Sequence, residues 1–387
     1  MIQYKKIEDI CSVIAGQSPP SSSYNQEKNG VPFFQGKADF NEKHPSIRYW
    51  CNEPKKISQP NDILISVRAP VGAININNIK SCIGRGLAAI RCGEDINLDF
   101  LFHYLRFQQK KIEDLGTGST FKAITIKTLK SIKIPLPPLK TQKQIASILN
   151  DAQALIQKTK QVLSAYDQLA QSIFLDMFGD PVTNPKEWEM KTLKSITKKI
   201  GSGATPRGGK DSYKKEGMPL IRSLNIHDNY FKKDNLAFID AEQAKKLDNV
   251  SLEKNDVLFN ITGASVARCA IVPSNCVPGR VNQHVSILRP KDEKLNSTFL
   301  LHLIISPNSK SKLLGVGKNN AATRESITKI QLEEFEIIVP PLTLQSQFAE
   351  KIELIEQQKE LAKKELKESE DLFQALLQKA FKGELIT

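Results

Sequence analysis

The chain has 387 residues, 40% of them hydrophobic, which is enough for two or three domains with apolar cores. Its formal net charge of +13 is typical of a protein that binds an anionic polymer, nucleic acid first, although an incidentally basic surface is the alternative. No stretch reaches the roughly 18 consecutive apolar residues of a membrane span, and Met1–Lys6 shows no signal-peptide pattern. We therefore expect a cytoplasmic protein without membrane contact. The six cysteines have no paired spacing, which excludes the usual metal sites and predicts reduced thiols without chemistry.

Residues 1–140 mix short β-branched runs with turn residues, as α+β domains do. The segments 62–67 and 87–91 are predicted strands, Leu98 to Lys111 is a predicted helix, and 132–136 is a last extended segment. This region is the first predicted domain.

A long helix is predicted over residues 141–179. Apolar positions recur there in alternating steps of four and three from Ile145 to Met177. That span corresponds to about 50 Å at 1.5 Å per residue, or roughly fifteen base pairs of DNA. A rigid rod of this length with a basic domain at each end would act as a ruler.

The second half of the chain repeats the first. Pro137-Pro138-Leu139 and Gln142 return as Pro340-Pro341-Leu342 and Gln345, 203 residues later in each case. The repeat predicts a linker over 180–187, a second α+β domain over 188–341 and a second long helix over 342–387. The two helices share their heptad register, so we expect them to pair as an antiparallel coiled coil with internal pseudo-twofold symmetry. The alternative is that each helix packs only on its own domain.

Polar residues in loops beside the repeated scaffold are the candidate DNA-binding residues, because Arg, Asn and Gln side chains match base edges in the major groove. The halves differ at these loops while the scaffold repeats. In the first half the candidates are Gln35, Lys37, Arg68, Arg85 and Lys122. In the second half they are Arg207, Arg222, Asn225, Thr262, Asn282, Gln283, His284, Lys318, Asn319 and Arg324. For each, a phosphate contact or no contact is the alternative.

Other polar residues have simpler interpretations. His103 and His302 repeat on an apolar helical face and are predicted to be packing residues. Residues 282–284 lie among alternating apolar positions, so they also fit a strand whose polar members face solvent.

Signs of catalysis are missing from the sequence. The segment 203–211 resembles a phosphate loop, but its spacing is one residue too long and Asp211 stands where Ser or Thr should bind magnesium. No Asn-Pro-Pro-Tyr-like motif for adenine methylation and no dense acid cluster occurs. We expect a chain that is not an enzyme, with no catalytic residue, metal or cofactor of its own.

The sequence resembles the specificity (S) subunits of type I restriction-modification systems over essentially its whole length. The resemblance rests on the Pro-Pro-Leu-x-x-Gln segments before both helices, on the linker from Phe178-Gly179-Asp180-Pro181 to Trp188, and on the closing Ala380-Phe381-Lys382-Gly383. It implies two α/β target recognition domains that each read one half of a bipartite, asymmetric site on double-stranded DNA. It also implies that the helices set the spacing and dock modification subunits, of which we expect two.

In that family S-adenosylmethionine is bound by the modification subunits, and ATP and magnesium by a restriction subunit where one joins. The rival interpretations are a tandem-domain adaptor with non-specific nucleic-acid affinity, and a lone nuclease or methyltransferase.

Overall fold

The computed structural model describes residues 3–118, 122–318 and 325–386. The chain divides into two compact units. Unit 1 consists of Met1–Lys160 and Lys364–Thr387, and unit 2 of Gln161–Lys363. Each unit thus combines one α+β module with one half of each long helix, whereas the sequence-based boundaries set the helices apart from the modules.

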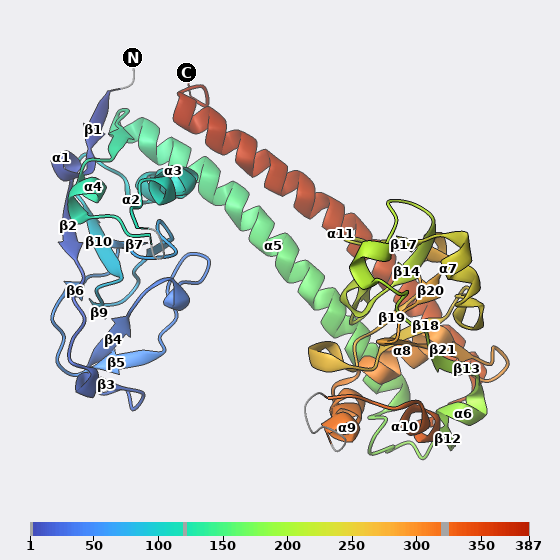
Figure 1. Cartoon of the computed structure of the whole chain (residues 1–387). Coiled ribbons are helices and arrows are strands. Elements are labelled where there is room, and N and C mark those ends of the chain that lie inside the picture. The colour runs from blue at the N-terminus through green and yellow to red at the C-terminus, as the bar shows by residue number, and fades with distance from the viewer. Residues whose placement is uncertain (1–2, 119–121, 319–324, 387) are drawn as a thin grey trace. The chain divides into compact units, whose positions relative to one another are not determined.

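The two long helices are α5 (Leu139–Phe178) and α11 (Leu342–Lys382) (Figure 1). Within unit 2, Asp167 on α5 forms an ion pair with Lys359 on α11, and further along the ring of Phe174 meets that of Phe348. The numbers rise along one helix as they fall along the other, which is the order of an antiparallel pair. In unit 1 the helices are joined by Lys160 and Glu370, whose charged atoms lie 3.2 Å apart. The expected antiparallel coiled coil is therefore confirmed.

The described residues of unit 1 form three sheets, with strand orders β1-β11, β2-β10-β7-β8 and β3-β5-β4-β9-β6. Its strands are β1 (Tyr4–Lys6), β2 (Cys11–Ala15), β3 (Tyr24–Asn25), β4 (Val31–Phe34), β5 (Tyr49–Cys51), β6 (Ile57–Ser58), β7 (Ile63–Ser66), β8 (Ile74–Ile76), β9 (Ser81–Ile83), β10 (Leu87–Cys92) and β11 (Lys133–Pro135). Its shorter helices are α1 (Ile7–Ile10), α2 (Leu98–Phe107), α3 (Gln109–Asp114) and α4 (Ile126–Lys130), with 3-10 turns η1 (Ser21–Ser23) and η2 (Lys37–Asp39).

Unit 2 repeats the four-stranded sheet as β13-β21-β18-β19, beside sheets β12-β22, β17-β14-β20 and β15-β16. Its strands are β12 (Met190–Thr192), β13 (Thr197–Ser202), β14 (Met218–Ile221), β15 (Ile226–His227), β16 (Tyr230–Phe231), β17 (Ala237–Ile239), β18 (Val257–Asn260), β19 (Cys269–Ile271), β20 (Arg280–Val281), β21 (Val285–Pro290) and β22 (Glu336–Ile338). Its shorter helices are α6 (Leu193–Ile196), α7 (Ala241–Lys245), α8 (Ser297–Ile305), α9 (Pro307–Lys318) and α10 (Lys329–Glu334), with 3-10 turns η3 (Gly209–Ser212), η4 (Ser223–Asn225), η5 (Asp248–Val250), η6 (Gly263–Ser265) and η7 (Ser274–Cys276).

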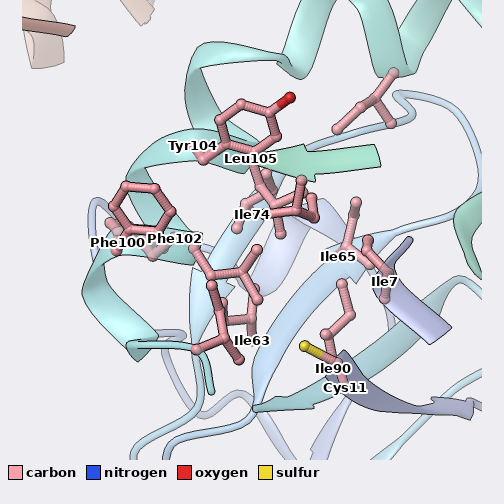
Figure 2. Packing of buried hydrophobic residues seen from close by; sticks show 14 of the residues in the cluster. Ile7, Cys11, Ile63, Ile65, Ile74, Ile90, Phe100, Phe102, Tyr104 and Leu105 are labelled. Atoms are coloured by element: carbon pink, nitrogen blue, oxygen red, sulfur yellow. The ribbon is translucent and has the colours of Figure 1, made fainter. Parts of the chain in front are cut away.

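The main apolar core of unit 1 lies between the β2-β10-β7-β8 sheet and helix α2. Figure 2 shows Ile63, Ile65 and Ile90 of the sheet facing Phe102 and Leu105 of the helix. These residues are fully buried or nearly so because both elements turn an apolar face inward. The helix predicted from Leu98 to Lys111 is in fact two helices, since the chain bends at Gln108 between α2 and α3.

The repeated glutamine explains the Pro-Pro-Leu-x-x-Gln signature. Gln142 is fully buried and accepts a hydrogen bond from the Asn97 backbone N–H at 2.8 Å. Its Nε2 donates to the carbonyl oxygens of Asp95 and Pro137, each at 2.9 Å. Gln345 makes the corresponding three bonds in unit 2, to Asn296 N, Lys294 O and Pro340 O. One buried amide therefore locks the start of each long helix onto the segment that leads into α2 or α8.

The end of each long helix is fixed by a repeated phenylalanine. Phe178 closes α5 and meets the ring of Phe299 of α8 at 4.7 Å between centroids. Phe381, 203 residues later, lies near the end of α11 and meets Phe100 of α2 at 5.6 Å. Trp188 of the linker donates its indole N–H to the Phe178 carbonyl at 2.8 Å, which folds the linker back against the helix end.

A polar cluster interrupts the apolar seam of unit 2. The buried Lys359 ammonium lies 2.8 Å from both Asp167 and Glu356. Burial lowers the pKa of Lys359, but its hydrogen bonds to the two carboxylates outweigh burial, so the pKa is raised. Lys359 thus stays charged and ties α11 to α5. His302 of α8 is buried nearby, beside a cavity of about 280 Å³ that Asp167 and Asp228 also line.

The predicted packing role of the two histidines agrees with their burial. His103 lies 2.9 Å from Asn150 Oδ1 on α5, whereas Nε2 of His302 has no hydrogen-bond partner among the described residues. None of the helices in the described part of the chain has the length and apolar character that a bilayer span requires.

Candidate nucleic-acid interface

Four of the five candidates of the first half line one groove of unit 1. Gln35, Lys37, Arg68 and Arg85 are exposed and surround a cavity of about 540 Å³. They come from three separate turns, so the fold brings together residues up to fifty positions apart in the sequence. We refer to this cavity as the unit 1 groove.

A buried carboxylate shapes the turn that presents Gln35 and Lys37. Asp39 is 1% exposed and accepts hydrogen bonds from the backbone N–H groups of Gln35 and Gly36 at 2.6 and 3.2 Å. Arg48 neutralises it, with its Nη2 at 2.6 Å. A carboxylate with these partners holds the turn after β4 closed, and the side chains of Gln35 and Lys37 remain outside it.

Arg85 is placed by tight backbone contacts between β9 and β10. The Arg85 N–H donates to Ser18 Oγ at 3.3 Å, and the Gly86 carbonyl accepts from Val67 N–H at 2.9 Å. A Cβ atom on Gly86 would lie 2.5 Å from the Gln35 carbonyl oxygen, so only glycine fits there. The loops of Gln35 and Arg85 therefore touch through their backbones while their side chains stay exposed.

Arg68 follows β7 and pairs by a backbone bridge with Ala123. Lys122 directly precedes Ala123 in the chain, so its backbone lies beside Arg68. Its side chain is exposed. Lys122 does not line the groove itself.

The charge of the unit 1 groove suits an anion. Among the described residues its lining includes the cationic Lys37, Arg68 and Arg85 and no carboxylate. Within the same part of the chain none of the three forms an ion pair, unlike Arg48 and Arg91, whose guanidinium nitrogens lie 2.6 and 2.8 Å from the buried carboxylates of Asp39 and Asp62. Unpaired guanidinium forks can bind phosphate or the O6 and N7 edge of guanine.

Further residues of the groove, among them Ser18 and Tyr24, were missed from the sequence. Ser18 lines it, and the repeat of Ser18-Pro19 as Thr205-Pro206 was the available signal. Tyr24 also lines the groove. Its hydroxyl donates a hydrogen bond to the Pro19 carbonyl at 2.9 Å, and its ring centroid lies 4.6 Å from that of Phe33. No local pattern marks Tyr24, since its position depends on the pairing of β3 with β5.

Unit 2 brings together a smaller set of its candidates. Thr262 Oγ1 lies 2.7 Å from His284 Nδ1, and Gln283 Oε1 accepts from the Thr205 backbone N–H at 2.7 Å. The second contact corresponds to that between Ser18 and Arg85 in unit 1. The loops after β18 and before β21 therefore meet as their counterparts do in unit 1, but with Thr262 and Gln283 where unit 1 has Arg68 and Arg85.

Asn225 and Asn282 were predicted to bind DNA, but the structure buries both side chains. Asn225 is fully buried, accepts from the Arg222 backbone N–H at 3.1 Å and donates to the Lys232 carbonyl at 3.0 Å. Asn282 is 5% exposed and accepts from the His284 N–H at 3.0 Å. Short amide side chains close turns in this way, so both residues support the backbone.

The other candidates of unit 2 are more accessible. Arg222 is half-buried, with its guanidinium 5.1 Å from the ring of Tyr213. Arg207 and Lys318 are exposed. Asn319 and Arg324 lie outside the described residues.

No group of three or more His, Cys, Asp or Glu side chains in the described ranges is arranged to hold a metal ion. The site consists instead of exposed polar and cationic side chains on turns that buried carboxylates, amides and glycines fix.

The chain is similar to known specificity subunits of type I restriction enzymes. The putative type I restriction enzyme MjaX specificity subunit of Methanocaldococcus jannaschii is 54% identical over 151 residues, which are 39% of this chain and 36% of that protein. The type I restriction enzyme EcoBI specificity subunit of Escherichia coli is 23% identical over 410 residues, 98% of this chain and 85% of that protein.

A solved structure has the same fold. The crystal structure of the type I restriction-modification system S subunit from M. genitalium matches with a TM-score of 0.60 at 16% identity, over 98% of this chain and 96% of that one. The family model of the type I restriction modification DNA specificity domain matches residues 2–165 and again 185–370. The adaptor interpretation is not favoured by these matches. Two repeated modules on a paired helical stem, each matched by the same model, show that the chain belongs to the family of type I restriction modification DNA specificity domains.

Proposed function

We propose that the chain is the DNA-binding specificity subunit of a type I restriction-modification complex, in which each unit reads one half of a bipartite, asymmetric site on double-stranded DNA. The observation that carries the proposal is the unit 1 groove, where Lys37, Arg68 and Arg85 stand beside Gln35 and the described residues of the lining include no carboxylate. The groove combines cations for phosphates with forked and paired donors for base edges.

The two units differ where they would read DNA. After β7 unit 1 has Arg68, and after β18 unit 2 has Thr262. Before β10 unit 1 has Arg85, and before β21 unit 2 has Gln283. Arginine favours guanine, whereas glutamine favours adenine. Different side chains on one repeated scaffold support the reading of two different half-sites.

The chemistry of the complex belongs to its partners in this proposal. The chain acts in the cytoplasm and performs no catalysis. S-adenosylmethionine binds to two modification subunits, and ATP and magnesium bind to a restriction subunit in complexes that contain one.

The long helices provide the docking surface for the modification subunits. On α5, Ile148, Leu155, Val162 and Leu169 recur every seven residues and are 37 to 46% exposed. On α11, Leu354 and Leu361 are 63% and 62% exposed at the same spacing. A heptad row outside the seam is the pattern that a further helix recognises.

Methylation mapping tests the groove. In cells that express the chain with its modification subunits, Arg85→Ala should relax or lose specificity in one half of the methylated sequence and leave the other half unchanged. The matched control is Lys6→Ala, which removes one positive charge from β1 of the same unit, away from the groove lining. Unchanged methylation in Arg85→Ala, or equal changes in both halves, would contradict the proposal.

Pull-down with the modification subunit tests the docking surface. Leu155→Asp and Leu169→Asp should each reduce its retention by at least about tenfold, since a buried apolar contact at an interface becomes a buried charge. Gln168→Asp adds the same charge at an exposed position that is already polar and should retain the partner. Equal retention in all three variants would rule out this face.

The spacing role has its own test. One heptad inserted into both α5 and α11 should lengthen the unspecified spacer between the half-sites by about three base pairs, because seven helical residues add roughly 10 Å. A methylated sequence with an unchanged spacer would show that the helices do not set the distance.

A further inference from the structure

Two cysteines of unit 1 face each other across neighbouring strands. In the antiparallel pairing of β10 with β2, Cys92 stands directly opposite Cys11. Cys11 belongs to the main core, where it is labelled in Figure 2, and Cys92 is half-buried at the end of β10. Both thiols are free.

The backbone hydrogen bonds define the type of this pair. The Gly93 N–H donates to the Ile10 carbonyl at 2.9 Å, one residue outside the pair on each strand. That pattern marks Cys11 and Cys92 as a non-hydrogen-bonded pair, in which the Cα atoms are about 4.5 Å apart and the side chains lie close together. Disulfides form at Cα separations of about 4.4 to 6.8 Å, so the strands already hold these residues at bonding distance.

The internal repeat shows that the thiols are not required by the scaffold. In unit 2 the Lys291 N–H donates to the Ile196 carbonyl at the same 2.9 Å, and the flanked pair is Thr197 opposite Pro290. The same strand geometry therefore exists without sulfur. Of these two equivalent pairs, the one in unit 1 consists of two cysteines.

The thiols also interact chemically. A hydrogen bond from Cys92 lowers the pKa of Cys11 in spite of its burial, and the same contact together with burial raises the pKa of Cys92. A thiol with a lowered pKa is the better nucleophile, and the neighbour that remains protonated is placed to react next.

We propose that Cys11 and Cys92 form an oxidative modification site that hydroperoxides convert into a disulfide between β2 and β10. In the first step the Cys11 sulfur attacks the peroxide, so that an S–O bond forms, the O–O bond breaks, and the leaving hydroxide takes the Cys11 proton as water. In the second step the Cys92 sulfur attacks the sulfenic sulfur of Cys11. The S–S bond forms, the S–O bond breaks, and the hydroxyl leaves as water with the Cys92 proton.

In balance, two thiols and one hydrogen peroxide give one disulfide and two waters. The bond closes a covalent loop over residues 11–92, which carries Gln35, Arg68 and Arg85 of the unit 1 groove. Oxidation would thus fasten the edge strand β2 of the sheet that supports the groove, whatever DNA the groove reads.

Peptide mapping of the full chain tests this site. The purified protein is treated with hydrogen peroxide under native conditions, alkylated, and digested with trypsin without reduction. A peptide of residues 7–28 linked to one of residues 92–106 should appear and should vanish after treatment with dithiothreitol. Cys92 that remains alkylated, or that is found only as sulfinic acid, would overturn the proposal.

Cys51 and Cys82 provide an internal control. They lie on β5 and β9, which flank β4, so two strand spacings of about 4.8 Å separate their Cα atoms, more than a disulfide spans, although the two thiols interact through a hydrogen bond. Their peptides, residues 49–55 and 81–85, should remain alkylated. A link between these two cysteines in place of the predicted one would show that the thiols react through unfolding and would refute the inference.

Thermal unfolding gives a second measure. Oxidised wild type should melt at a higher temperature than the reduced protein, by several degrees, and Cys92→Ser treated in the same way should show no such rise. Cys92 is at the half-buried end of its strand, so this variant is the one that retains the fold. If the disulfide-bonded protein melted at or below the melting temperature of the reduced protein, the disulfide would have to distort the sheet, which would contradict the proposal.

Discussion

Lowering the pH should destabilise unit 2 through His302. Burial, and then the charge of Lys359, lowers the pKa of His302 to about 4, while a histidine in an unfolded chain titrates near 6.5. Between these values the unfolded chain binds more protons than the folded one, so stability is lost as the pH falls from about 6.5 to 4. A shift of about 2.5 units corresponds to roughly 3 kcal/mol in full, of which about 2 kcal/mol is lost between pH 7.5 and pH 5.

Urea unfolding of two matched proteins measures this loss. The chain has two tryptophans, Trp50 in unit 1 and Trp188 in unit 2, so a Trp50→Phe background reports on unit 2 by fluorescence. The unfolding free energy is compared at pH 7.5 and pH 5 with and without His302→Gln, which removes the titrating group and keeps a polar side chain. The charged neighbours Asp167, Asp228 and Lys359 are kept in both proteins.

The decisive quantity is the difference between the two pH-dependent losses. The protein with His302 should lose about 2 kcal/mol more than the His302→Gln protein over this range. Equal losses would refute the assignment of His302 as a histidine that folding keeps neutral.

Three further changes address the repeated scaffold. Gln142→Leu removes three hydrogen bonds and should destabilise unit 1 by roughly 2 to 4 kcal/mol, with Trp50 fluorescence as the readout and an unchanged Trp188 transition as the control. Gly203→Ala places a Cβ 1.8 Å from the Val281 carbonyl oxygen, so we expect a loss of at least about 2 kcal/mol in unit 2, whereas Gly201→Ala, in open space, should cost little. Asp167→Ala leaves Lys359 with Glu356 alone and should lower the unfolding free energy of unit 2 by about 1 to 3 kcal/mol, as measured by urea titration. Stability equal to wild type in any of these variants would contradict the role given to that residue.

The duplication and the paired helices could be predicted from the sequence because both are periodic. A heptad row from Ile145 to Met177 needs only helical geometry to define an apolar face, and its return 203 residues later supplies the partner face. The helix starts were less accurate, since α5 begins at Leu139 where Thr141 was expected. Proline is tolerated ahead of the first turn, so the helix extends back to the residue that follows Pro138.

The candidate interface was only partly accessible from the sequence. Polar loop residues could be selected by type, and Gln35, Lys37, Arg68 and Arg85 do share a groove. The same residue types also close turns, however, and nothing in their local sequence separates the exposed Gln283 from the buried Asn282 beside it.

What the sequence by itself determined was therefore the repeat, the coiled coil and the basic character of the loops, all of which follow from local spacing and composition. Only the tertiary structure decided which side chains face outward together and which thiols stand opposite each other. Cys11 and Cys92 are 81 positions apart and become neighbours through the register of β2 and β10 alone. A tight turn fixes the register of strands that are adjacent in the chain, but no turn joins β2 to β10, so their register depends on the fold of the residues between them.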